Sequence, residues 1–135
     1  MDLKLKPISH AGIPEALEKI ALYRYLNEPE EAESICRDIL AIDADNQAAI
    51  RSLALTITDQ FTGALSDRYA EAESLFNSLA DPYEQLYYTG LLYERRAKAQ
   101  LEARRIGDAL KHAYHGELEL QYEQGEQFVR VTWTR

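Results

Sequence analysis

The chain has 135 residues and a formal net charge of −8 at pH 7, with 46% apolar residues, 28% charged residues, six glycines and four prolines. A domain of this length buries roughly two thirds of its unfolded surface, so folding requires neither a metal nor a disulfide. The composition excludes a disordered chain and favours helices, and the negative charge argues against general binding to nucleic acid or anionic membranes.

Apolar spacing predicts five helices in chain order before the sequence becomes ambiguous. Pro14 and Pro29 suit first helical turns, where a missing N–H costs little. Asn27 is the expected cap of the second helix, because Glu30 follows it at the capping-box spacing. The predicted helices cover residues 13–26, 29 to the turn at 43–46, 47–59, 67–80 and 82–104.

Short polar residues mark the later helix boundaries. Asp45 or Asn46 can cap the third helix, Ser66 the fourth and Asp81 the fifth. The fifth helix is long, and Gly107 is expected to break it. Its inward stripe is predicted to consist of Leu86, Gly90, Tyr93, Ala97 and Leu101.

The C-terminal part of the sequence allows two interpretations. A continuous i, i+4 ladder of apolar residues favours a sixth helix from Asp108 to about Gln124. Residues 117–134 also alternate apolar and polar side chains, as a β-hairpin does, but a lone hairpin is marginally stable in water. We therefore expect the helix, followed by an extended or short-strand tail over residues 125–135.

Small residues recur at similar places in the three predicted helical pairs. In the first helices, Ala21 and Ala54 are 33 residues apart, and Ala54 and Gly90 are 36 apart. In the second helices, a small residue precedes a core residue by four positions, in the pairs Ala32/Cys36, Ala72/Phe76 and Ala109/Ala113. Such spacing is typical of a repeat with a period near 34 residues.

The stretch "NEPEEAESICRDILAIDADNQAAIRSLALT" resembles the tetratricopeptide repeat (TPR) family, and the chain is similar to short bacterial TPR proteins with no assigned activity. The resemblance implies an all-α, right-handed stack of about three helical hairpins, six helices in total. Residues 1–12 would be a lead-in, residues 13–124 the repeat domain and residues 125–135 the tail. The last hairpin would be covered either by the tail or by a second copy of the chain in a homodimer.

The resemblance also implies a concave face, formed by the first helix of each hairpin, that holds an extended peptide or a partner helix. Arg51 with Tyr25 and Tyr87 could hold a carboxylate and stack on an apolar side chain. The alternative is that the residues of this face are surface or packing residues of a degenerate repeat. The full set is Leu22, Tyr25, Arg51, Leu55, Thr58, Tyr87, Leu91 and Glu94.

Other chemistry has little support. His112, His115 and Glu119 share a helical face and could ligate a metal, but no Cys or carboxylate cluster accompanies them. Cys36 falls on an apolar stripe, which predicts an inert core thiol. The basic run Arg95, Arg96, Lys98, Arg104 and Arg105 is spread around its helix and is expected to be a solvated face rather than an RNA site.

The expected function is therefore non-catalytic protein interaction on the concave face, with no cofactor and no metal. The partner would be an unidentified protein or peptide, and neither nucleic acid nor membrane. The alternative is a structural or assembly subunit that associates with itself through its helical faces. A single cysteine and the lack of an apolar run of signal-peptide length favour the cytoplasm.

Overall fold

The computed structural model describes residues 8–62 and 67–114. These residues form a short 3-10 helix, η1 (His10–Gly12), and five α-helices, and they contain no strand. The helices are α1 (Ile13–Tyr25), α2 (Pro29–Ile42), α3 (Gln47–Asp59), α4 (Asp67–Asn77) and α5 (Pro82–Tyr114). The chain is thus all-α over its described part, as predicted.

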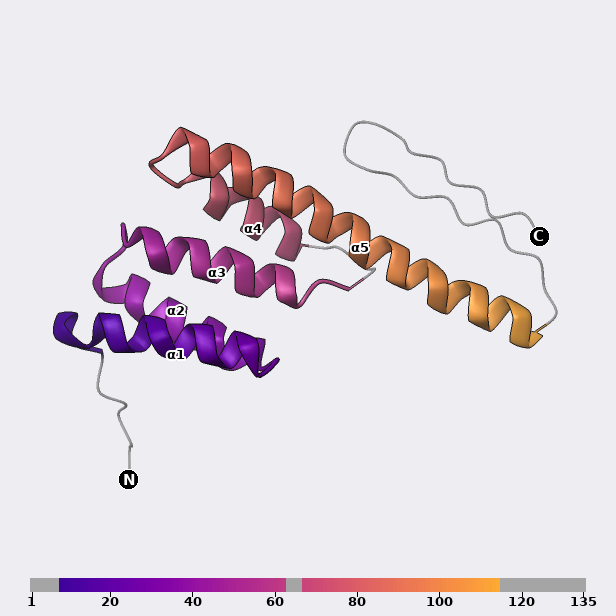
Figure 1. The fold of residues 1–135 in the computed structure, drawn as a ribbon, viewed down its shortest axis with the longest axis horizontal. Coiled ribbons are helices and arrows are strands. Elements are labelled where there is room, and N and C mark those ends of the chain that lie inside the picture. Colours follow the sequence, from indigo (N-terminus) through magenta and orange to yellow (C-terminus); the bar gives the residue numbers. More distant parts are fainter. Residues whose placement is uncertain (1–7, 63–66, 115–135) are drawn as a thin grey trace, which may run out of the picture.

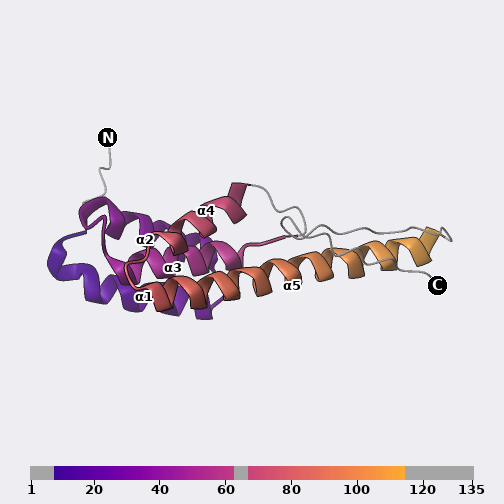
Figure 2. The ribbon, with the colours of Figure 1, turned by 90° about the horizontal axis from the view of Figure 1, so that it is seen from above.

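Each helix packs against the next one along the chain, so the helices form a continuous stack. In addition, α3 contacts both α1 and α5, and Figure 1 shows these three helices following one another across the stack. The C-terminal half of α5 extends beyond the ends of the other helices in both views (Figures 1 and 2). None of the described helices combines the length and apolar content that crossing a bilayer requires.

Asn27 ends α1 instead of capping α2, which corrects the prediction. Its φ of 59° places it in the left-handed region, which Asn tolerates better than most residues. The N–H of Asn27 donates to the carbonyl of Arg24, and the N–H of Glu28 donates to that of Tyr23. These two bonds form a Schellman motif, so Glu28 becomes the N-cap of α2 and Pro29 its first residue.

The caps of α3 and α5 follow the predicted polar residues. The Asn46 side-chain oxygen accepts from the Ala49 N–H at 2.9 Å. The Asp81 carboxylate accepts from the Tyr83 N–H, also at 2.9 Å. Each bond satisfies a donor of the first turn that has no partner within the helix, so local sequence positions both helix starts.

Gly107 does not break α5, contrary to the prediction. The helix continues through Gly107 to Tyr114, and no separate helix begins at Asp108. A glycine inside a helix costs only about 1 kcal/mol relative to alanine, and the helix-forming residues on both sides offset this cost. The expected sixth helix beyond residue 114, the hairpin alternative and the tail lie outside the described residues.

The core is a single cluster between the helices, and it includes Cys36, which is fully buried. On α5, the side chain that enters this core is Leu92, with Tyr88 packed at its edge. The predicted inward stripe of α5 instead faces solvent: Leu86 is 76% exposed and Leu101 is 52% exposed. The stripe prediction was wrong because α5 has apolar residues on two opposite faces, and only one of them meets α3 and α4.

The small residues expected at helix contacts differ in their burial. Ala54, in the central helix α3, is fully buried. Ala21 and Gly90 are exposed, and a Cβ atom built on Gly90 would meet nothing within 4 Å. Ala54 lies in close helix contacts because, of α1, α3 and α5, only α3 packs against all the other helices.

Polar cross-links join positions about one repeat period apart. Arg24 of α1 pairs with Asp59 of α3, and Arg51 of α3 pairs with Glu84 of α5. A third ion pair joins Arg37 of α2 to Glu71 of α4 at 2.7 Å. The paired residues are 33 to 35 positions apart in all three cases. Ion pairs at this spacing thus link α1 to α3, α3 to α5, and α2 to α4.

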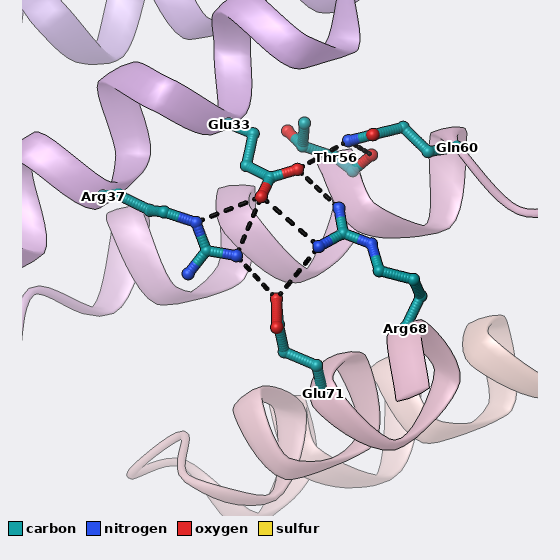
Figure 3. Close-up of polar contacts among 6 residues, drawn as sticks. All are labelled: Glu33, Arg37, Thr56, Gln60, Arg68 and Glu71. Atoms are coloured by element: carbon teal, nitrogen blue, oxygen red, sulfur yellow. Dashed lines mark hydrogen bonds and ion pairs between the residues drawn. The ribbon is translucent and has the colours of Figure 1, made fainter. Parts of the chain in front are cut away.

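Glu33 is the centre of the cluster that joins α2 to α4 (Figure 3). Both Arg37 and Arg68 donate to its carboxylate, and so does the side chain of Gln60. Glu71 accepts from the same two arginines. Two positive and two negative charges thus compensate one another, which is the arrangement of a structural clamp.

Candidate functional site

A hollow with a polar lining lies where α1, α3 and α5 meet. Its volume is about 680 Å³, within the range of pockets that hold ligands. We call it the α1–α3–α5 hollow. It is lined by Ala21, Arg24, Tyr25, Asn27, Thr58, Asp59, Phe61, Arg95, Lys98, Ala99 and Glu102.

Arg24 and Asp59 hold one wall of this hollow in place. The Arg24 Nε donates to one Asp59 oxygen at 2.7 Å, and a terminal nitrogen donates to the other oxygen at 3.2 Å. This two-point geometry is the strong form of an arginine–carboxylate pair. Because the two charges neutralise each other, the pair shapes the hollow without giving it a net charge.

Arg95 supplies the uncompensated charge of the hollow. Its side chain is half-buried, and it makes no hydrogen bond or ion pair with any residue that the structure describes. The neighbouring Lys98 pairs with Glu94 at 3.1 Å, and Glu102 pairs with Arg105 at 3.1 Å. A guanidinium beside apolar and aromatic lining can bind a carboxylate and support an apolar group next to it.

A second, smaller hollow lies at the start of α5. Its volume is about 320 Å³, and it is lined by Asp81, Tyr83, Glu84, Tyr87 and Tyr88. We call it the tyrosine hollow. Its lining consists of aromatic rings and carboxylates, so its chemistry is opposite to that of the α1–α3–α5 hollow.

The eight residues predicted for the concave face are distributed between these places. Tyr25 and Thr58 line the α1–α3–α5 hollow, and Tyr87 lines the tyrosine hollow. Arg51 does not meet Tyr25 at either hollow; its guanidinium pairs with Glu84 at 2.9 Å. Tyr25 and Tyr87 thus line different hollows, and Arg51 lines neither of them.

The other predicted residues have varied environments. Leu22 is exposed, whereas Leu55 and Leu91 are half-buried, Leu55 against the core. Thr58 is buried, and its hydroxyl donates to the Leu55 carbonyl at 2.6 Å. Glu94 pairs with Lys98. Leu22 and Leu91 line neither of the two hollows.

Arg24, Asp59 and Arg95 were missed as site residues. Arg24 and Asp59 are 35 residues apart, and when Ala21 is aligned with Ala54 the position equivalent to Arg24 is Ile57, so the repeat alignment by itself does not find the pair. Arg95 was interpreted as part of a solvated basic run. Only the packing of α5 against α3 shows that Arg95, unlike Arg96, lines the hollow; the guanidinium of Arg96 instead lies 4.5 Å from the Tyr69 ring centre.

The groups in the described residues that bear on nucleophilic or metal chemistry are the Cys36 thiol and the His, Asp and Glu side chains. Burial raises the pKa of the Cys36 thiol to about 12, so the thiol stays protonated at neutral pH. Among residues 8–62 and 67–114, no three His, Cys, Asp or Glu side chains gather as metal ligands do. His115 and Glu119 of the proposed metal set lie outside the described residues.

Comparison of the chain with protein-family models, with curated proteins and with solved structures gives no match in any of the three. Function is therefore inferred from the chemistry of the chain itself.

Proposed function

We propose that the chain is a non-catalytic protein-interaction module with a TPR-like arrangement of hairpins. The face formed by α1, α3 and α5 holds a peptide or a partner helix, and the α1–α3–α5 hollow is its main contact point. The partner is a protein or peptide of unassigned identity. A cytoplasmic location is part of the proposal, because the single Cys36 is buried and offers no disulfide.

The repeat arrangement is supported by the cross-links at intervals of 33 to 35 residues. This interval is close to the 34-residue period of the TPR family. In a stack of such hairpins, the first helices share one face, and that face is available to a ligand. The hydrogen bond from the Ala80 N–H to the Gln47 side chain, 33 residues away, follows the same interval.

The observation that carries the function is the unpaired Arg95 in a hollow with aromatic walls. A half-buried guanidinium without a described partner retains its ability to bind an anion. Tyr25 and Phe61 supply rings, and Ala21 and Ala99 leave room between the helices. A partner side chain with a carboxylate beside an apolar group matches this lining.

The test begins with peptides selected from a random library against the full chain. We expect their binding to be lost in Ala99→Trp, which fills the hollow, and weakened about tenfold in Arg95→Ala. The matched controls are Ala41→Trp, at an exposed position of α2, and Lys19→Ala, at an exposed position of α1. If no peptide is selected, or if the selected peptides bind Ala99→Trp normally, the proposal is wrong.

A second candidate function is supported by the outer face of α5. Leu86, Tyr93 and Leu101 are exposed along this face, and Gly90 leaves room for a close helix contact. Large exposed apolar patches often mark contacts between proteins. The chain would then be an assembly subunit that forms a homodimer through α5.

Light scattering distinguishes this alternative. A dimer that becomes a monomer in Leu86→Glu and in Leu101→Glu would support self-association. Leu26→Glu is the control, because Leu26 is also 52% exposed but lies at the end of α1. A wild-type chain that is monomeric at all concentrations tested would contradict the assembly function and leave the peptide-binding proposal unaffected.

A further inference from the structure

Three tyrosines gather at the start of α5 and leave much of their ring surface uncovered. Tyr83 is 72% exposed and Tyr87 is 57% exposed. The rings of Tyr83 and Tyr87 are stacked with centres 6.4 Å apart, and Tyr87 meets Tyr88 edge-on at 5.0 Å. Tyrosine side chains are usually half-buried, so two adjacent rings exposed by more than half beside a hollow require an explanation.

Tyr88 anchors this cluster to the core. Its ring stacks on the fully buried Phe76 with centres 5.2 Å apart and planes 9° apart. Tyr87 leans on Tyr88 and Tyr83 on Tyr87, so the exposed rings rest on a ring that the core already holds. The rings are therefore held in place before a ligand binds, and binding would cost little conformational free energy for ordering them.

The charge of the tyrosine hollow is negative. Its lining contains the carboxylates of Asp81 and Glu84 and no Lys or Arg. Glu84 is neutralised by Arg51, which lies outside the lining. Asp81 accepts a hydrogen bond from the Tyr83 N–H but makes no ion pair with the described part of the chain. One carboxylate thus remains uncompensated next to the electron-rich faces of the rings.

Tyrosine faces attract cations through the ring quadrupole, and a nearby carboxylate adds to this attraction. We propose that the tyrosine hollow binds a cationic side chain, Lys or Arg, from the segment that the interaction face holds. This inference rests on the proposed function for its biological ligand. The volume of about 320 Å³ is sufficient for one long side chain.

The proposal also assigns different charges to the two hollows. The α1–α3–α5 hollow contains the cation Arg95 and the tyrosine hollow contains the anion Asp81, and neither has an ion-pair partner among residues 8–62 and 67–114. The ligand would therefore place an acidic group at the first hollow and a basic group at the second. Such a pattern favours one orientation of the bound segment and disfavours its reverse.

The experiment uses tetramethylammonium chloride as the probe and neopentyl alcohol as a water-soluble neutral counterpart of similar size and branching. Both are titrated into the full 135-residue chain at constant ionic strength, and the ring resonances of the tyrosines are followed by NMR. We expect saturable shifts for Tyr83 and Tyr87 with tetramethylammonium, and none with neopentyl alcohol. The probe needs no peptide, so its result does not depend on the test of the proposed function.

Two variants separate the contributions of ring and charge. Tyr87→Leu keeps an apolar side chain but removes the ring face, and should abolish the shifts at Tyr83. Asp81→Asn keeps a side-chain acceptor for the Tyr83 N–H but removes the charge, and should weaken binding about fivefold. Tyr23→Leu, at a half-buried tyrosine of α1 that lines neither hollow, is the control and should leave the titration unchanged.

Absence of saturable shifts at Tyr83 and Tyr87 would overturn the inference. Equal binding of neopentyl alcohol would also overturn it, because the hollow would then be an apolar contact rather than a cation site. A positive titration together with failed peptide selection would retain the cation site and reject only the proposed function.

Discussion

Arg24 and Asp59 are 35 residues apart in the sequence, yet their side chains form a two-point ion pair between α1 and α3, with the shorter contact at 2.7 Å. The pair lies on the wall of the α1–α3–α5 hollow and is only partly exposed. The pair therefore follows the spacing of the predicted repeat, and it also shapes one wall of the proposed binding face.

Arg24→Ala and Asp59→Ala should each lower the free energy of unfolding by about 1 to 2 kcal/mol, because each leaves a partly buried charge without its partner. The double variant should cost less than the sum of the two, with a coupling of about 1 kcal/mol. Urea unfolding of the four proteins measures this cycle. Strict additivity would show that the ion pair contributes nothing to stability.

Acid should weaken the clamp between α2 and α4 through Glu33. Burial alone would raise the pKa of this carboxyl, but hydrogen bonds from Arg68, Gln60 and Arg37 outweigh it and lower the pKa from 4.5 to about 2. A lowered folded-state pKa means that the stabilisation is complete above pH 4.5 and is lost as the pH falls towards 2. We expect a loss of roughly 1 to 2 kcal/mol across this window, after allowance for partial exposure.

Urea unfolding at a series of pH values tests this dependence. Glu33→Gln should be less stable than the wild type at pH 7 and should have a flatter stability profile between pH 4.5 and 2. Glu18→Gln, at an exposed position of α1, should retain the wild-type profile. Identical profiles for wild type and Glu33→Gln would contradict the assignment.

Two threonines of α3 should respond oppositely to the same substitution. Thr56 is fully buried, and among the described residues its hydroxyl makes no hydrogen bond of standard geometry, its neighbour being the Cys36 thiol, a weak partner. Thr56→Val removes this poorly satisfied polar group at nearly constant shape and should raise the stability by about 1 kcal/mol. Thermal unfolding measures the difference.

Thr58→Val is the matched comparison, because Thr58 is also buried but its hydroxyl donates to the Leu55 carbonyl at 2.6 Å. This variant loses a made hydrogen bond and should be less stable by roughly 0.5 to 1 kcal/mol. Stabilisation by both substitutions would mean that burial alone, rather than hydrogen bonding, decides the effect.

Gly90→Ala should stabilise the chain by about 0.5 to 1 kcal/mol, because alanine is the better helix former and its Cβ would enter open space. Gly12→Ala is the control and should not show this gain in stability, because Gly12 is the N-cap of α1 and does not lie inside a helix. Destabilisation by Gly90→Ala, measured by urea unfolding, would indicate a close contact at the outer face of α5 and would favour the assembly function.

Local pattern determined most helix positions in this protein. The apolar period and the turn at 43–46 predicted α3 with its observed bounds, Gln47–Asp59, and the stripe of α2 placed Cys36 in the core. These features depend on residues within a few positions of one another, so the sequence contains the necessary information. Gly107 was misjudged because a single weak helix former does not outweigh its neighbours.

Tertiary structure alone decided the faces of α5 and the partners of the arginines. Since α5 has apolar residues on two sides, its periodicity cannot show that Leu92 enters the core while Leu86 remains exposed. The periodicity of α5 also cannot show that Arg51 pairs with Glu84, whereas Arg95 has no described partner. These outcomes depend on how each helix is rotated against its neighbours, and that rotation is set by packing between different helices, from the Phe76–Tyr88 stack, 12 positions apart, to the Arg51–Glu84 pair, 33 positions apart.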